Sequence, residues 1–319
     1  MKFVFRADAS ASLGSGHAMR CAALAEEAKS RGIECLHLGS LGEIEWLEEY
    51  YGLIDIPQLS NTDLEKLDFS DSVLITDAYH LDPNQELFNS PYWKLRVVIA
   101  DDSTPKYKAD LIVHPGLESN FGSWNSARVL AGPAYIPLRK SIVKREKISF
   151  PQSKARVVIF GGGTDPFDFA GHFSKILKNF LEFSSAVVFT DSHFEIADER
   201  FKSKKFGVEL DSEISSSDIV FTTASTSSLE VIAREVPVGI ACVIDNQEMN
   251  YETLGRLEVA ARIGRRKPEG GWEFELKSIH QLLNDFSFRK ELVSASQKLI
   301  DLDGSKRIVD EIFLLTSEG

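Results

Sequence analysis

Short apolar runs alternate with longer helix-like stretches along most of this 319-residue chain. In the first half, five runs have the length and composition of buried strands: Phe3–Arg6, Ile33–Leu38, Val73–Thr76, Val97–Ala100 and Leu111–Val113. Residues His17–Ser30, between the first two runs, are predicted to form a helix. This alternation is typical of βαβ units, in which crossover helices join parallel strands. The first half is therefore predicted to be an α/β domain with a doubly wound sheet.

The alternation stops at a charged segment and then restarts. Residues 139–154 are rich in charge and contain Pro151, which is typical of an exposed connection. We place the domain boundary there, with an N-terminal domain of residues 1–144 and a C-terminal domain of residues 145–319. The second domain is expected to contain the strands Ala155–Phe160, Ala186–Thr190, Asp218–Thr222, Val238–Cys242 and Ala260–Ile263, and the helices Asp168–Leu181, Thr226–Glu235 and Gln247–Leu257.

The C-terminal stretch Phe286–Leu315 predicts one or two amphipathic helices broken near Asp303-Gly304. The last of these can pack back onto the first domain. A chain of this length is expected to form about two domains, because single cores stop growing at roughly 250–300 residues. The predicted fold class is thus α/β, with two doubly wound, Rossmann-like domains facing a cleft. Ligands of open α/β sheets bind at the carboxyl ends of the strands, so the site is expected in that cleft.

Composition and charge exclude several classes of function. The chain is 43% hydrophobic and 26% charged, as in ordinary globular proteins, and its net charge is −12. That charge repels phosphate backbones, and no basic patch opposes it, so we expect neither nucleic acid nor membrane as a partner. The spacing of the three cysteines fits a reducing cytosol. Without a signal peptide or a spanning apolar run, the protein is expected to be soluble and cytoplasmic.

The strongest local motif is a small-residue loop between the first strand and its helix. The strand end Arg6-Ala7-Asp8 leads into Gly14-Ser15-Gly16-His17, and Arg20 lies one turn further. Glycines permit close backbone approach, and the N–H groups of the first helical turn can hold an anion or a sugar. The helix dipole disfavours imidazolium at His17, which leaves a neutral base for activating water. The alternative is a tight turn with a solvated histidine, and without a third glycine it is no dinucleotide fingerprint.

A second glycine-rich loop, Gly161-Gly162-Gly163-Thr164-Asp165-Pro166, follows the first strand of the second half. Three successive glycines are expected where a ligand or another backbone comes close. No Lys-Ser/Thr pair follows, so the loop is not a P-loop. We consider phosphate or sugar contact and a flexible hinge as its functions, with Asp165 as a turn or N-cap residue in the alternative.

A third motif is a helix start rich in hydroxyl groups. The predicted strand Asp218–Thr222 leads into Ala224-Ser225-Thr226-Ser227-Ser228, whose N–H and hydroxyl groups favour a diphosphate. Glu230, one turn into the helix, is placed to accept hydrogen bonds from ribose hydroxyls. The alternative is an N-cap with a first-turn glutamate.

Polar residues also follow other predicted strands. Asp245-Asn246-Gln247 precedes a helix, and capping explains these residues equally well. In the first domain, Asp77-Ala78-Tyr79 and Asp101-Asp102-Ser103 are expected to point toward the cleft, although aspartates commonly form turns. No set of residues has the spacing of metal ligands, so no metal is expected.

In their order along the chain, these motifs resemble those of the UDP-2,4-diacetamido-2,4,6-trideoxy-β-L-altropyranose hydrolases, a family of pseudaminic acid biosynthesis with a MurG-like GT-B fold. The resemblance covers nearly the whole chain. Its specific part is the loop Leu13–Cys21 together with Arg6-Ala7-Asp8. Gly162–Asp165, Thr226 with Glu230, and Asn246-Gln247 are shared with GT-B glycosyltransferases, including the MurG type.

The resemblance implies a reaction and a set of site residues. His17 is the expected base, activating water for attack at the anomeric carbon while UDP leaves, with no metal or other cofactor. The residues implied for UDP are Gly161, Gly162, Gly163, Thr164, Ser225, Thr226 and Ser227 at the diphosphate, Glu230 at the ribose, and the backbone near Val208 and Leu210 at the uracil. Those implied for the sugar side are Asp8, Gly14, Ser15, Gly16, Arg20, Tyr79, Asn246 and Gln247.

This chain departs from the family pattern at Ala224-Ser225, where glycines are usual, and Cβ atoms there can hold a diphosphate further away. Two other functions therefore stay open. One is a GT-B glycosyltransferase with a UDP-sugar donor, which differs from the hydrolase only in the attacking group. The other is a non-catalytic homologue that binds nucleotide sugars. The first domain lacks an amphipathic basic patch for a lipid acceptor, which favours water as the acceptor.

Overall fold

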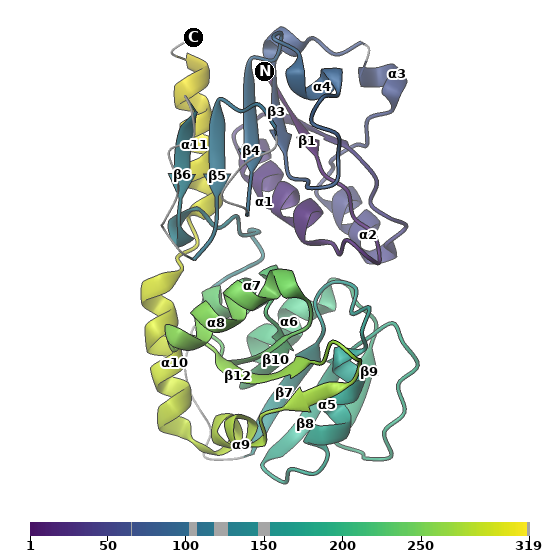
Figure 1. Cartoon of the computed structure of the whole chain (residues 1–319), viewed down its shortest axis with the longest axis vertical. Coiled ribbons are helices and arrows are strands. Elements are labelled where there is room, and N and C mark those ends of the chain that lie inside the picture. The colour runs from purple at the N-terminus through teal and green to yellow at the C-terminus, as the bar shows by residue number, and fades with distance from the viewer. Residues whose placement is uncertain (65, 102–106, 118–126, 146–153, 318–319) are drawn as a thin grey trace. The chain divides into compact units, whose positions relative to one another are not determined.

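The computed structural model describes residues 1–64, 66–101, 107–117, 127–145 and 154–317 (Figure 1). The chain divides into two compact units. The first unit comprises Met1–Lys140 together with Leu302–Gly319, and the second comprises Ser141–Asp301. The chain therefore leaves the first unit after Lys140, where the sequence placed the boundary after residue 144, and returns to it with its last helix.

The first unit is built on a six-stranded sheet in the order β2-β1-β3-β4-β5-β6. Its strands are β1 (Lys2–Arg6), β2 (Glu34–Leu38), β3 (Ser72–Thr76), β4 (Leu95–Ile99), β5 (Leu111–His114) and β6 (Arg128–Ala131). All neighbouring strands pair in parallel, and the chain moves outward from β1 to β2 before crossing back to β3. This is the predicted doubly wound arrangement. The sequence missed β6, because this short edge strand begins with an exposed arginine and lacks a continuous apolar run.

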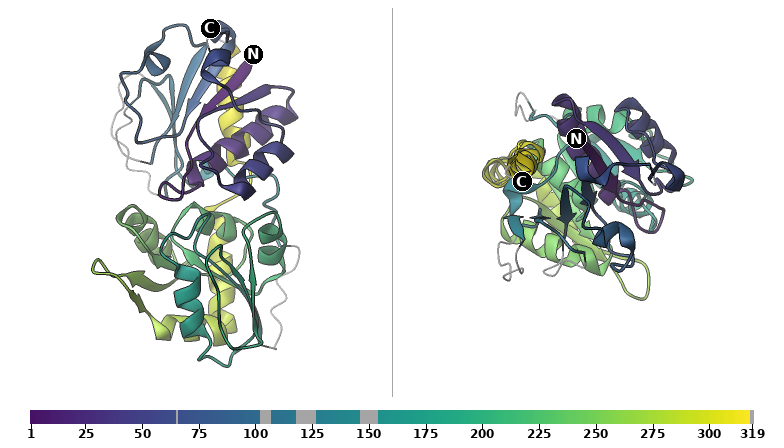
Figure 2. Two further views of the ribbon diagram at one scale, coloured as in Figure 1. Left: turned by 90° about the vertical axis from the view of Figure 1, so that its right-hand side faces the viewer. Right: turned by 90° about the horizontal axis from the view of Figure 1, so that it is seen from above.

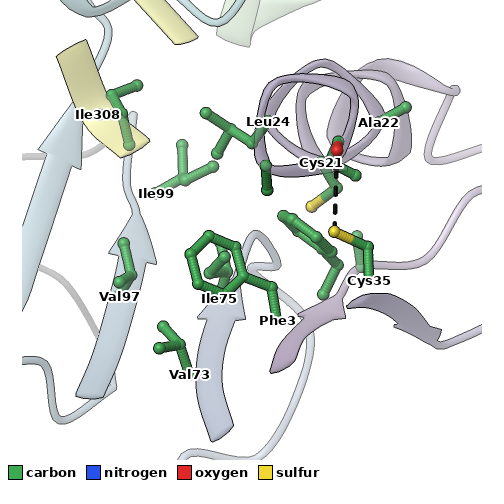
Figure 3. Packing of buried hydrophobic residues seen from close by; sticks show 14 of the residues in the cluster. Phe3, Cys21, Ala22, Leu24, Cys35, Val73, Ile75, Val97, Ile99 and Ile308 are labelled. Atoms are coloured by element: carbon green, nitrogen blue, oxygen red, sulfur yellow. Dashed lines mark hydrogen bonds between the residues drawn. The ribbon is translucent and has the colours of Figure 1, made fainter. Parts of the chain in front are cut away.

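Helices cover this sheet. They are α1 (Gly16–Ser30), α2 (Glu45–Leu53), α3 (Asn61–Leu64), α4 (Glu86–Asn89) and α11 (Gly304–Ser317), with 3-10 turns at Phe69–Asp71 and Pro133–Tyr135. Helix α11, yellow in Figures 1 and 2, lies along the strands of the first unit and contacts α1. Figure 3 shows Leu24 of α1 and Ile308 of α11 packing with Phe3 and Ile99 of the sheet. The C-terminal helix thus completes a core that the first 140 residues leave open.

The first residue of α11 has to be a glycine for steric reasons. The preceding helix ends at Leu299 and α11 begins at Gly304, close to the predicted break at Asp303-Gly304. A Cβ atom on Gly304 would lie 2.0 Å from the carbonyl oxygen of Ile136. Only glycine therefore lets the start of α11 approach the chain this closely.

The second unit contains a seven-stranded sheet in the order β13-β12-β11-β10-β7-β8-β9. Its strands are β7 (Ala155–Phe160), β8 (Phe183–Phe189), β9 (Phe201–Lys204), β10 (Ile219–Thr223), β11 (Val238–Cys242), β12 (Ala261–Arg266) and β13 (Trp272–Phe274). All pairs are parallel except β12 with β13. The five predicted strands are confirmed. The edge strands β9 and β13 were missed because they are short and partly exposed.

The helices of the second unit are α5 (Phe169–Leu177), α6 (Glu209–Ser216), α7 (Thr226–Ala233), α8 (Glu248–Arg256), α9 (Leu276–Asn284) and α10 (Phe286–Leu299), with a 3-10 turn at Asp245–Gln247. The predicted helix Asp168–Leu181 ends earlier, at Leu177, because the N–H groups of Asn179 and Phe180 turn back to Ile176 and Leu177. In the described part of the chain, no helix is both long and apolar enough to cross a membrane.

One buried histidine makes the first unit sensitive to acid. His37, on β2, is fully buried beside the Tyr51 ring, and neither of its ring nitrogens has a hydrogen-bond partner among the described residues. Burial, together with the nearby Arg6, lowers the pKa of His37 to about 4 from its ordinary 6.5. Between pH 6.5 and about pH 4, His37 binds a proton in the unfolded chain but not in the folded chain. The free energy of unfolding therefore decreases as the pH falls through this window.

We predict that His37→Leu flattens the pH dependence of unfolding. In the wild type, His37 should lower the free energy of unfolding by about 3 kcal/mol between pH 7 and pH 4. Urea unfolding at a series of pH values measures this contribution as the difference between the two proteins. His193→Leu, which removes an exposed histidine, serves as the control. An acid response in His37→Leu as steep as that of the wild type would contradict the assignment.

Candidate functional site

The loop between β1 and α1 delivers His17 to the carboxyl edge of the first sheet. The N–H of Gly14 donates to the carbonyl of Ser10 at 2.8 Å, which closes a tight turn. Gly14 adopts φ +77° in open space, so its backbone conformation, and not crowding, favours glycine here. Helix α1 then starts at Gly16 after Ser15, whose side chain makes no capping hydrogen bond. His17 therefore lies in the first turn, as predicted.

A buried carboxylate holds His17. Asp77, which directly follows β3, is fully buried, and its Oδ1 lies 2.6 Å from His17 Nδ1. Arg20 binds the same carboxylate through Nε and Nη2, at 2.8 Å each. Both Asp77 oxygens accept guanidinium hydrogen bonds, so Oδ1 is the acceptor in the 2.6 Å contact and the hydrogen there belongs to Nδ1. The neutral imidazole then carries its lone pair on Nε2.

Arg20 also links this pair to Asp101 and Tyr79. Its Nη1 donates to both oxygens of Asp101, at 2.6 and 2.9 Å, and the Tyr79 hydroxyl donates to the same carboxylate. Burial opposes ionisation of Asp101, but the adjacent guanidinium outweighs it and lowers the pKa of Asp101 to about 2. The Tyr79 ring lies edge-on to His17, with the ring centroids 4.6 Å apart. Asp102 and Ser103 lie outside the described residues.

The charged groups around the His17 imidazole do not cancel. Asp77 and Asp101 contribute two negative charges, and Arg20 contributes one positive charge, so the surroundings of the imidazole carry a net charge of −1. The buried Asp77 carboxylate therefore opposes the positive end of the α1 dipole at this position.

Asp8, expected on the sugar side, already accepts three hydrogen bonds. Its Oδ1 accepts the backbone N–H of Ser40 at 2.8 Å, and its Oδ2 accepts from Arg6 and from His80, also at 2.8 Å. Although burial opposes ionisation, the hydrogen bonds from Arg6 and Ser40 lower the pKa of Asp8. His80 belongs to none of the motifs recognised in the sequence. Its position three residues after Asp77, in a loop that follows a strand, is the signal that identifies it.

The second unit brings two of the predicted phosphate loops together. The Thr223 hydroxyl lies 3.5 Å from the carbonyl oxygen of Gly161 and 3.1 Å from Ser225 Oγ, which joins the glycine loop after β7 to the start of α7. Gly162 adopts φ +98°, and a Cβ atom there would lie 3.6 Å from Ser225 Oγ. The Ser225 side chain makes no capping hydrogen bond. Helix α7 therefore starts at Thr226 beside this contact, without an N-cap side chain on its first-turn N–H groups.

Asp165 has the structural function that the sequence left open. Its carboxylate accepts the N–H groups of Phe169 and Ala170, at 2.8 and 2.9 Å, at the start of α5. A Cβ atom on Gly161 would lie 2.1 Å from that carboxylate. Gly161 is therefore a glycine because Asp165 occupies the space beside it. Burial raises the pKa of Asp165, against the effect of its two backbone hydrogen bonds.

The remaining predicted residues occupy separate places in the second unit. Asn246 is exposed, whereas Gln247 Oε1 accepts the N–H of Val243, the residue after β11, at 3.1 Å and does not cap α8. Val208 is exposed at the start of α6, and the N–H of Leu210 donates to the carbonyl of Gly207. The half-buried Glu230 lies one turn into α7.

We predict that Arg20→Lys destabilises the first unit by about 2 kcal/mol, because an ammonium cannot fork to two carboxylates and leaves the buried Asp77 underpaired. Arg96→Lys is the matched control. Arg96 forks onto the single, partly exposed carboxylate of Asp110, so its replacement should cost under about 1 kcal/mol. Urea unfolding measures the free energy of unfolding of both variants. Equal losses in the two would contradict the conclusion that Arg20 stabilises the buried Asp77.

Comparisons with known proteins identify the fold. No family model matches the chain, and no curated protein matches it. Among solved structures, MurG from Acinetobacter baumannii superposes with a TM-score of 0.63 at 15% identity, covering 98% of this chain and 99% of that one. The UDP complex of UGT89C1 from Arabidopsis thaliana gives 0.70 at 12% identity, covering 99% and 100%.

A third similar structure is a UDP-N-acetylglucosamine 2-epimerase, described as putative, from Listeria monocytogenes. Its TM-score is 0.58 at 12% identity, and the match covers 97% of this chain and 94% of that one. At these identities the likeness is one of fold. Together with the two doubly wound sheets, it shows that this chain has the GT-B fold, with two Rossmann-like units.

Proposed function

We propose that this chain is a nucleotide-sugar hydrolase. It releases UDP and the free sugar from a UDP-linked diacetamido-trideoxy sugar, as in pseudaminic acid-type nonulosonate biosynthesis. The observation that carries the proposal is the contact of His17 with the buried Asp77, which leaves Nε2 as the acceptor for a proton. The motif resemblance supports the sugar, and solved GT-B structures with bound UDP support the nucleotide.

In the proposed reaction, His17 Nε2 takes a proton from a water molecule as the water oxygen forms a bond to the anomeric carbon. The bond from that carbon to the β-phosphate oxygen breaks, and UDP leaves with the electron pair. His17 becomes an imidazolium, which the net −1 charge of Asp77, Arg20 and Asp101 stabilises. UDP is a good leaving group, so the essential task of the protein is to activate and aim the water.

Arg20 acts in this scheme as a positioning residue. Its three nitrogens donate to Asp77 and Asp101, so it fixes the carboxylate that orients His17. The backbone of Gly14, Ser15 and Gly16 and the half-buried Tyr79 are proposed sugar contacts from this part of the chain.

The second unit holds UDP in this proposal. The N–H groups of Thr226 and Ser227, with Gly161–Thr164 and Ser225, bind the diphosphate, because an uncapped helix start beside a glycine loop attracts an anion. Glu230 binds the ribose in this proposal, and the backbone near Val208 and Leu210 binds the uracil. Asn246 and Gln247 contact the sugar or its phosphate. Such binding needs no net positive charge, which suits a chain with a net charge of −12. No metal or cofactor takes part.

The three cysteines support a cytoplasmic location for this activity. Cys21, Cys35 and Cys242 are buried and form no disulfide. Burial raises the pKa of the Cys35 and Cys242 thiols to about 12, so both stay protonated and unreactive. Protonated, buried thiols persist in a reducing compartment.

A GT-B glycosyltransferase is the second candidate, favoured by the fold shared with MurG and with the transferase SpnP. In that case a sugar hydroxyl replaces water at His17, and UDP release depends on an added acceptor. A non-catalytic nucleotide-sugar binder is the third, because Ala224-Ser225 replaces glycines beside the diphosphate. Tight UDP binding without UDP release from any nucleotide sugar identifies it.

We predict that His17→Asn lowers kcat for UDP release by about 100- to 10,000-fold, the usual contribution of a general base. Asp77→Asn should lower kcat by about 100-fold or more, because the amide NH2 can donate to Nδ1 and hold the imidazole in the other tautomer. UDP affinity, measured by calorimetry, should stay unchanged in both variants.

Asp55→Asn is the control for these variants, since Asp55 is a carboxylate of the same unit whose side chain is 90% exposed. Its turnover should equal that of the wild type. Unchanged turnover in His17→Asn would rule out the assigned base.

The diphosphate assignment predicts that Gly162→Ala weakens UDP binding about tenfold, because alanine strains the left-handed backbone of the loop. Gly270→Ala is a matched control, since Gly270 has φ +97° against +98° at Gly162 but lies in the β12–β13 connection. Calorimetry with UDP compares both variants with the wild type. Equal affinity in all three proteins would remove the glycine loop from the site.

A further inference from the structure

Two neighbouring segments of the first unit, after β1 and after β3, are joined by two histidine–aspartate pairs. Each segment contributes the histidine of one pair and the aspartate of the other. His17, which follows the β1 loop, pairs with Asp77 at the end of β3, and His80, in the β3 loop, pairs with Asp8 at the end of β1. Strands β1 and β3 are adjacent and parallel, so both pairs lie at the carboxyl edge of one sheet. The first pair supplies the proposed base. The second has no function in the reaction as derived above.

The anchor of His80 is rigid. Asp8 is only 14% exposed, and besides His80 it holds Arg6 and the N–H of Ser40. A carboxylate fixed by a guanidinium and a backbone N–H cannot move away with the imidazole, so it sets the plane of the ring. Because Asp8 accepts from Nε2–H of His80, the neutral ring presents its lone pair on Nδ1.

His80 remains accessible in this arrangement. Its side chain is 41% exposed, and Nδ1 has no partner among the described residues. Ligands of open α/β sheets bind at the carboxyl edge, so a fixed hydrogen-bond acceptor there is in a position to bind one. His193, by contrast, pairs with Glu195 where both side chains are at least 80% exposed, so nothing fixes that ring.

We propose that His80 binds the sugar of the substrate and helps to select it. Its Nδ1 accepts a hydrogen bond from an N–H or O–H group of the sugar, such as an acetamido N–H. The identity of this ligand rests on the proposed hydrolase function, whereas the placement of His80 rests on the His80–Asp8 contact alone. His80 thus adds a contact that distinguishes sugars with a donor at this position from those without one.

Kinetics of UDP release from the diacetamido-trideoxy nucleotide sugar test this contact. His80→Ala and His80→Gln should each raise KM about tenfold, the value of one hydrogen bond, with kcat little changed. Gln can still donate to Asp8 but lacks an acceptor at the Nδ1 position, so the two variants should match. His193→Ala is the control and should leave KM unchanged. A wild-type KM in both His80 variants overturns the inference.

A second readout separates this inference from the hydrolase function. In ¹⁵N spectra of the histidine side chains, the nucleotide sugar should shift the His80 Nδ1 signal, and UDP alone should not. A shift without UDP release supports the contact and overturns hydrolysis. UDP release without a shift and with unchanged KM overturns the contact and keeps hydrolysis. If the His80 signal does not shift and no UDP is released, both the contact and the hydrolase function are overturned.

Discussion

The first unit depends on how it accommodates the fully buried carboxylate of Asp77. A charge removed from water is costly unless it is paired and hydrogen-bonded. Arg20 provides two hydrogen bonds and His17 a third, and Asp101 then balances the other side of the guanidinium. Stabilising this one charge fixes the tautomer and orientation of His17. The proposed base is therefore a consequence of the same interactions that hold β3, α1 and the β4 end together.

The second unit uses backbone where the first uses side-chain charge. The hydroxyl groups of Thr223 and Ser225 tie the glycine loop to the start of α7, and Asp165 closes the loop onto α5 from the other side. The start of α7 has no side-chain cap. In the proposed function its backbone N–H groups bind the diphosphate, and such binding needs no basic patch. The Cβ atoms of Ala224-Ser225, which replace the usual glycines, have to fit within that arrangement.

The sequence predicted the sheets well because parallel strands buried on both faces form continuous apolar runs, as Val73–Thr76 and Ala155–Phe160 do. It failed at β6, β9 and β13, whose exposed residues interrupt such runs. Motif residues were recognised singly, but their pairings were not: Asp77 and His17 lie sixty residues apart in the chain. Arg20 and Asp8 illustrate the limit, since only the folded contacts show which groups they pair with.

The central claim is that water held by His17 attacks the anomeric carbon. The most direct measurement is to run the reaction in H₂¹⁸O and locate the label by mass spectrometry. One ¹⁸O atom is predicted in the released sugar, with none in UDP, after correction for exchange of the anomeric hydroxyl with solvent in a sample of unlabelled sugar. Label in the phosphate of the nucleotide product would show attack at phosphorus and would contradict the account.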